Sequence, residues 1–234
     1  MTDAFQHPQE AVEHLRRSDS VMATVIDAVG PPAMRAPSES VYEALGRAIL
    51  YQQLAGAAAT AIMIRFKRIY APDEPEGRFP EPGELIATDD ETLRASGLSR
   101  QKLSYLKDLA AHVLDGGIVD DEIAALSDEE IIERVSSVKG IGRWTAEMLL
   151  IFHLQRPDVL PVDDLGVRNA FRRLYNLPEA PKAPEMIELA EPWRPYRSLG
   201  TWYLWQSFDF NLMGETNVPG TRAESTREEG AAAS

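Results

Sequence analysis

Amphipathic periodicity is the feature of this 234-residue sequence that most constrains its fold. Apolar residues recur every three or four positions in eight stretches, a spacing that gives a helix one apolar face. These stretches are residues 11–29, 41–70, 101–114, 128–135, 143–154, 164–174, 185–190 and 199–213. Glycine and proline clusters separate several of them, and no stretch alternates convincingly in the way of a strand. The pattern predicts an all-α protein.

The composition is that of a globular chain. At 44% hydrophobic residues, it can bury one substantial core or two lobes of a single unit. From residue 217 onward Gly, Ala, Ser and Glu dominate without apolar period, so residues 217–234 are expected to form a disordered tail. The sequence shows neither a leader peptide nor an apolar run of roughly 18 residues, and we therefore expect a cytoplasmic protein without membrane contact. Zero cysteines exclude disulfides, cysteine zinc sites and iron–sulfur clusters, and the four histidines lack metal-ligand spacing, so no metal is expected.

Charge is distributed unevenly along the chain. The net charge of −13 argues against a nucleic-acid partner, because binding to a polyanion depends on Lys and Arg. However, residues 73–133 hold 17 acidic and 5 basic residues, whereas residues 134–173 hold seven bases and four acids. A polyanion could therefore bind at residues 134–173. The sequence leaves open whether the acidic segment faces away from that partner or binds another one.

A glycine turn lies at the start of this cationic stretch. Gly140 and Gly142, two residues apart, precede the helix expected from Arg143. Glycines permit unusual backbone angles and close approach, and the free amides of a helix N-terminus favour an anion such as phosphate. A plain tight turn is the alternative explanation for the glycines alone.

Longer blocks around this turn resemble a known family. The segment VKGIGRWTAEMLL followed by LPVDDLGVRNAF is similar to the helix-hairpin-helix DNA glycosylase superfamily, in particular the 3-methyladenine DNA glycosylase II branch in its compact form without an N-terminal β domain. The blocks RAILYQQLA, GLSRQKLSYLKDLA and EPWRPYRSLGTWYLWQ extend the resemblance from Ser40 to Met213.

The resemblance implies a fold and an activity. The expected fold is all-α and two-lobed, with the active site in the interlobe cleft. One lobe would span residues 38–158 and end in the helix-hairpin-helix, and the other would combine residues 1–37 and 159–216. The implied activity is hydrolytic release of N3-methyladenine-type alkylated purines from duplex DNA in base excision repair. The protein would act as a monomer without a cofactor. Whether the hairpin carbonyls bind a monovalent cation is left open. The residues expected to bind DNA phosphates are Val138, Lys139, Gly140, Ile141, Gly142, Arg143 and Thr145.

Two adjacent acids, Asp163 and Asp164, open the next predicted helix. Taken alone, an acid at this position is a helix cap. The resemblance assigns the catalytic role to Asp164 and leaves Asp163 as a cap or loop contact. A carboxylate stabilises the positive charge that develops on the sugar as the N-glycosidic bond breaks. Bifunctional relatives place a nucleophilic lysine where this chain has Trp144, so no Schiff base and no lyase activity are expected here.

Aromatic residues are the candidates for holding an extruded base. Stacking compensates for the loss of base pairing, and cation–π attraction favours positively charged alkylated purines. The resemblance points to Trp205 and Trp144 for the base pocket. Trp202 and Tyr203 are further candidates for this pocket, although the face that their helix turns inward is left undecided, and Trp193 is expected to be structural. The wedge that fills the gap in the duplex would be Gln53 or Leu54, although a glutamine bound to backbone is an equal alternative.

Two other functions stay open at this point. The chain could be a glycosylase of the same superfamily for other damaged or mismatched bases. It could also be a non-catalytic helix-hairpin-helix module that only binds DNA, which would leave the acid and the aromatic cluster without a purpose.

Overall fold

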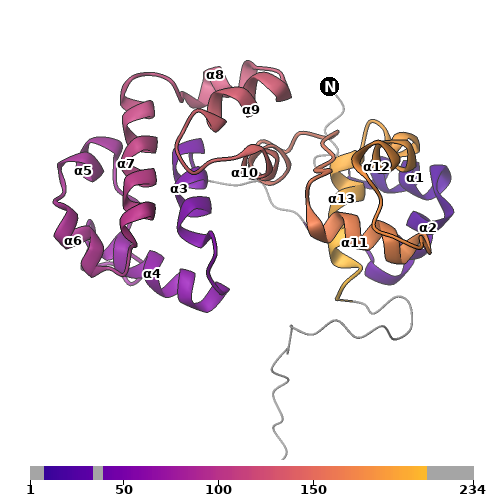
Figure 1. Cartoon of the computed structure of the whole chain (residues 1–234), viewed down its shortest axis with the longest axis horizontal. Helices are drawn as coiled ribbons and strands as arrows, with labels where there is room; N and C mark the ends of the chain where they lie inside the picture. Colours follow the sequence, from indigo (N-terminus) through magenta and orange to yellow (C-terminus); the bar gives the residue numbers. More distant parts are fainter. Residues whose placement is uncertain (1–7, 34–38, 210–234) are drawn as a thin grey trace, which may run out of the picture.

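A computed structural model describes residues 8–33 and 39–209, and every regular element within these ranges is helical (Figure 1). The all-α prediction is therefore confirmed. None of the described helices has the length and apolar character needed to cross a bilayer. The predicted tail at residues 217–234 lies outside the described residues.

The helices form two lobes, with α10 (Arg143–Met148) between them (Figure 1). The first lobe contains α3 (Val41–Tyr51), α4 (Gly56–Arg68), α5 (Pro82–Ala87), α6 (Asp90–Ala95), α7 (Arg100–Leu114), α8 (Asp120–Ala125) and α9 (Asp128–Ser136), and α10 continues into a π-helical turn, η1 (Leu149–His153). The second lobe contains α1 (Pro8–Ser18), α2 (Ser20–Val29), α11 (Leu165–Leu174), α12 (Ala183–Leu189), the 3-10 turn η2 (Glu191–Trp193) and α13 (Arg197–Gln206).

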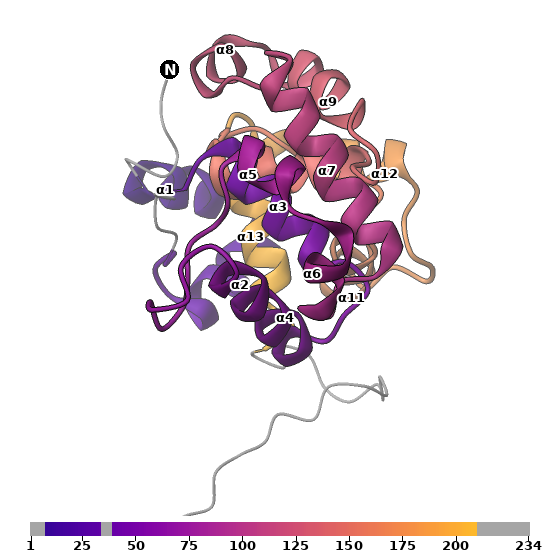
Figure 2. The same ribbon diagram turned by 90° about the vertical axis from the view of Figure 1, so that its left-hand side faces the viewer.

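Each lobe has its own hydrophobic core. The first core is built from residues 41–159, with α3 and α5 packed on the central helix α7. The helices of this first lobe face the viewer in Figure 2. The second core combines residues 11–26 with residues 160–204. Val159 belongs to the first core and its neighbour Leu160 to the second. The lobe limits at residues 38 and 216 fall on residues outside the described ranges and stay predictions.

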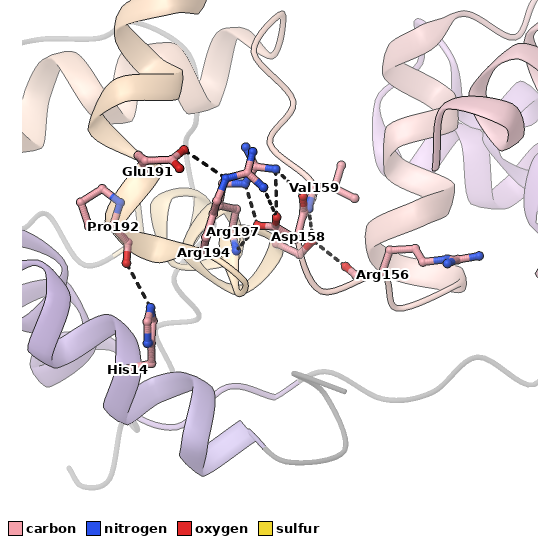
Figure 3. Close-up of polar contacts among 9 residues, drawn as sticks. His14, Arg156, Asp158, Val159, Glu191, Pro192, Arg194 and Arg197 are labelled. Atoms are coloured by element: carbon pink, nitrogen blue, oxygen red, sulfur yellow. Dashed lines mark hydrogen bonds and ion pairs between the residues drawn. The ribbon is translucent and has the colours of Figure 1, made fainter. Parts of the chain in front are cut away.

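Polar contacts fix the segment that crosses between the lobes (Figure 3). The Asp158 carboxylate accepts hydrogen bonds from the guanidinium groups of Arg197, at 2.6 Å from Nε, and of Arg194. The Ser198 hydroxyl accepts the Val159 N–H at 2.9 Å and donates to the Arg156 carbonyl at 2.6 Å. The crossover is therefore anchored to the start of α13 in the second lobe.

Two of the predicted helices are each divided into two. The 11–29 stretch breaks at Asp19, whose carboxylate accepts the N–H groups of Val21 and Met22 and caps α2. The 41–70 stretch breaks at residues 52–55, hereafter the α3–α4 loop. Helices α5, α6 and α8, of six residues each, were not predicted.

Candidate active site

Asp164 lies where α11 begins, at the junction between the lobes. It is the N-cap of that helix, and its Oδ1 accepts the backbone N–H of Val167 at 2.7 Å. Asp164, and not Asp163, caps α11, so the cap alternative for Asp163 was wrong; Asp163 is an exposed residue of the preceding turn, and its other alternative, a loop contact, stays a prediction. Only one oxygen of a carboxylate is needed to cap a helix, so Asp164 can cap α11 through Oδ1 and still present Oδ2 for chemistry.

Two tryptophans from different lobes donate to this carboxylate. Trp144, on α10, donates its indole N–H to Oδ2 of Asp164 at 2.7 Å. Trp205, on α13, donates its indole N–H to Oδ1 at 3.1 Å. The Asp164 side chain is thus fixed by three N–H donors, and the residue is only 9% exposed. Its orientation depends on both lobes keeping their relative position.

Aromatic surface lies beside the carboxylate. Trp144 is 48% exposed although its N–H is engaged, so its ring can contact a ligand. Phe152, in the π-helical turn, stacks on Trp205 with ring centroids 5.4 Å apart and is also exposed. Gly166 closes the other side, since a Cβ there would lie 3.0 Å from Asp164 Oδ1 and 3.4 Å from the Trp205 ring. The sequence did not identify Phe152, because its side chain reaches Trp205 only through the tertiary packing of the two lobes.

The structure places two of the predicted pocket residues elsewhere. Tyr203 is fully buried in the second core, where its hydroxyl donates to the Gly30 carbonyl at 3.0 Å, so the prediction for Tyr203 was wrong. Trp202 is buried in the same core and packs edge-on against Tyr203, which corrects the prediction for Trp202. Both side chains point to the side of α13 that packs on the second lobe. Trp193 is structural as expected, stacked on Phe171 and fully buried.

The glycine hairpin, residues 138–142, has the backbone geometry that its sequence predicts. Gly140 adopts φ +82°, and a Cβ there would lie 2.1 Å from the ring of Tyr105, so only glycine fits. The side chains of Val138, Ile141 and Thr145 are buried and cannot contact a phosphate. Any phosphate contact from these three residues therefore has to come from their backbone.

Carboxylates of the acidic segment neutralise the cations of the hairpin. Asp108, on α7, accepts the Lys139 backbone N–H at 2.9 Å and the Lys139 ammonium at 2.8 Å. Burial alone would raise the pKa of Asp108, but the hydrogen bonds from Lys139 outweigh it and lower this pKa. The Arg143 guanidinium pairs with both oxygens of Glu129, at 2.6 and 3.0 Å, and with Glu147 at 3.1 Å. A phosphate that binds Lys139 or Arg143 must therefore displace these carboxylates, and phosphate binding by the two residues stays a prediction.

The α3–α4 loop borders a cavity of about 880 Å³. Gln53 and Leu54 are exposed on this loop, and they line the cavity together with Gly140 and Trp144. Asp164 and Trp205 are not among its lining residues. The cavity therefore meets the carboxylate site at Trp144, and Asp164 lies outside its lining.

Metal binding has little support in the described ranges, where no group of three or more His, Asp or Glu side chains could hold an ion. Two hairpin carbonyls already accept hydrogen bonds, that of Val138 from the Ile141 N–H and that of Gly140 from the Gln52 amide. A monovalent cation at these carbonyls stays a prediction.

A family model described as HhH-GPD superfamily base excision DNA repair protein matches residues 47–195, which include the α3–α4 loop, the glycine hairpin and Asp164. The chain belongs to this superfamily. DNA-3-methyladenine glycosylase 1 of Schizosaccharomyces pombe is 42% identical over 197 residues, covering 83% of this chain and 85% of that protein. Alkylbase DNA glycosidase-like protein mag2 of the same yeast is 34% identical, covering 85% of this chain and 92% of that protein. The HhH-GPD assignment confirms the resemblance inferred from the motifs.

Solved structures of the HhH-GPD superfamily share the two-lobed fold. The S. pombe 3-methyladenine DNA glycosylase in complex with abasic DNA superposes with a TM-score of 0.76 at 40% identity, covering 88% of this chain and 100% of that one. A DNA-3-methyladenine glycosidase from Bacillus halodurans superposes with a TM-score of 0.74 at 30% identity, covering 84% and 88% of the two chains. The predicted fold class is confirmed.

Proposed function

We propose that this protein is a monofunctional DNA glycosylase that hydrolyses the N-glycosidic bond of alkylated purines, of the N3-methyladenine type, in duplex DNA. It leaves an abasic site and acts as a monomer in base excision repair. The observation that carries the proposal is the Asp164 carboxylate, held between the indole N–H groups of Trp144 and Trp205 beside exposed aromatic surface. Two relatives, a DNA-3-methyladenine glycosylase and an alkylbase DNA glycosidase-like protein, support the same substrate class.

The reaction follows from the charge that each group carries. As the base departs, positive charge develops on the deoxyribose, and a carboxylate within reach stabilises that charge and can orient the attacking water. An N-alkylated purine is itself cationic, so it is attracted to the exposed faces of Trp144 and Phe152 by about 0.5–2 kcal/mol each. A normal base lacks this attraction and is a poorer leaving group.

The lyase reaction needs an amine that can attack the sugar. Trp144 stands at the position where the bifunctional branch has its lysine, and its side chain carries no nucleophile. The hairpin lysine Lys139 is engaged with Asp108, and Lys102, which lines the same cavity as Gly140, is engaged with the Leu50 carbonyl. We therefore propose that catalysis stops at the abasic site.

The test is incubation with a duplex carrying one N3-methyladenine or 7-methylguanine, followed by alkaline strand cleavage. We expect Asp164→Asn to lose roughly 100-fold or more in single-turnover rate, while asparagine still caps α11. Asp163→Asn is the matched control, because it removes the adjacent exposed charge, and it should retain activity. Equal rates for the wild type and Asp164→Asn would remove Asp164 from the mechanism.

The same assay separates the remaining alternatives. Strand breaks before alkali, with a complex trapped by borohydride, would contradict the monofunctional proposal. Release of deaminated or mismatched bases instead of alkylated purines would assign another substrate within the superfamily. DNA binding without release of any base would identify a non-catalytic module.

A further inference from the structure

One side chain ties the α3–α4 loop to the glycine hairpin. Gln52 is the C-cap of α3, and its Nε2 donates a hydrogen bond to the Gly140 carbonyl at 2.9 Å, across 88 residues of sequence. The sequence motifs pointed to the two following residues, Gln53 and Leu54, and not to Gln52. The bond joins the predicted wedge to the predicted phosphate-binding turn, which are separate parts of the first lobe.

Both ends of this hydrogen bond are held in place. On the hairpin side, Gly140 adopts φ +82° and lies directly against the Tyr105 ring, so its backbone has little room to move. On the loop side, the Lys102 ammonium donates to the Leu50 carbonyl in the last turn of α3. The Gln52 amide therefore connects two rigid parts, and the geometry of the loop relative to the hairpin depends on it.

The residues that follow Gln52 are the exposed ones. Gln53 adopts φ +57°, a left-handed conformation that is uncommon for any residue other than glycine and persists only where the surroundings impose it. Leu54 is 38% exposed, and both side chains line the cavity that Gly140 and Trp144 also border. The bond from Gln52 thus sets where Gln53 and Leu54 lie relative to the hairpin and to Trp144.

We propose that Gln52 is a positioning residue for base extrusion: its amide couples the loop that enters the base stack to the turn that binds the DNA backbone. The inference rests on the proposed glycosylase function. Extruding a nucleotide requires force on the base while the flanking phosphates stay in place. A loop that could shift against the hairpin would move in response to the duplex, and the base would stay stacked.

The test compares Gln52→Leu, which removes the donor, with Gln52→Glu, which places a carboxylate against the Gly140 carbonyl. Excision from the lesion duplex is measured under single turnover, and extrusion is measured by fluorescence of 2-aminopurine next to the lesion. Affinity for undamaged duplex is measured separately. Ser127→Ala is the control for stability, because it removes the capping box of α9 in the same lobe and leaves the loop–hairpin bond intact.

We expect Gln52→Leu to slow excision about tenfold, the loss typical of one hydrogen bond, and Gln52→Glu to slow it more. The 2-aminopurine signal should fall in parallel, while affinity for undamaged duplex changes by less than about threefold and Ser127→Ala excises at the wild-type rate. Normal extrusion by both Gln52 variants, or an equal defect in Ser127→Ala, would overturn the role of Gln52. Failure of the wild type itself to release a base would instead refute the proposed function.

Discussion

Neutralising Glu129 should strengthen non-specific DNA binding and make it more sensitive to salt. In the structure Glu129 forms a bidentate pair with Arg143, the first residue of α10 after the glycine hairpin. The hydrogen bonds from Arg143 lower the pKa of Glu129, so Glu129 is ionised at neutral pH. A phosphate that binds Arg143 must displace this carboxylate first. Glu129→Gln removes the competing charge.

The size of the effect follows from the exposure of the pair. The side chains of Arg143 and Glu129 are 49% and 71% exposed, and pairs of this kind contribute about 0–1 kcal/mol. Affinity for undamaged duplex should therefore rise by at most about fivefold. If freed Arg143 adds one phosphate contact, the slope of log K against log salt should steepen by about 0.9. Glu147 still contacts Arg143 in the variant and keeps it near the hairpin.

Fluorescence anisotropy titrations of an undamaged duplex at several salt concentrations measure both quantities. Glu84→Gln is the matched control, because Glu84 forms a bidentate pair with Arg78 beside α5, away from the hairpin, and the substitution changes the net charge equally. We expect the control to keep the wild-type slope. An unchanged slope in Glu129→Gln would refute the reasoning, and equal steepening in both variants would assign the effect to net charge alone.

Three further predictions concern the hairpin and the site. Burial raises the pKa of Glu147 to about 7, so the folded protein holds this proton more tightly than the unfolded chain, and stability should fall by up to about 3 kcal/mol as pH rises from 4.5 to 7.5. Urea unfolding should find no such loss in Glu147→Gln, and identical pH profiles would contradict this. Gly140→Ala should lower stability by about 2 kcal/mol or more in thermal unfolding. Adding Tyr105→Ala to this variant should restore part of the lost stability, because it removes the clash with the ring but not the positive φ. Complete restoration would exclude backbone strain. Trp144→Phe keeps the ring but loses the donor to Asp164, so single-turnover excision should slow about 10- to 100-fold, and a wild-type rate would mean that this hydrogen bond does not position the carboxylate.

The sequence was sufficient to predict what depends on short-range pattern. Helical periodicity gave the fold class, and the motif around Asp164 located the carboxylate that the structure places at the lobe junction. The break at the α3–α4 loop could not be seen, because its position depends on a left-handed Gln53 and on the hydrogen bond of its neighbour Gln52 to the distant Gly140. Periodicity also cannot tell which face of α13 turns toward its own lobe, so Tyr203 stayed a pocket candidate although its hydroxyl binds Gly30 inside the second lobe, whereas Trp205 reaches Asp164.

Partner choice among charged residues was equally inaccessible. The sequence contains an acidic segment and a cationic stretch, but only the packing of α7 and α9 against the hairpin decides that Asp108 binds Lys139 and Glu129 binds Arg143. The composition left open what the acidic segment, residues 73–133, does, and the structure answers this in part. Some of its carboxylates serve as internal counterions for the hairpin.

The second core combines residues that precede the first lobe in the sequence with residues that follow it, and this sets the order in which the two cores form during synthesis. Helices α1 and α2 leave the ribosome before the other described helices, but their apolar faces are covered by α11 and α13, which follow on the order of 10 s later at 5–20 residues per second. The first lobe is contiguous and can complete its core in that interval. During this interval the nascent chain exposes apolar side chains such as Leu15 and Ile26, through which it must not aggregate. Because Trp144 and Asp164 come from different lobes, catalytic competence is the last property the nascent polypeptide acquires.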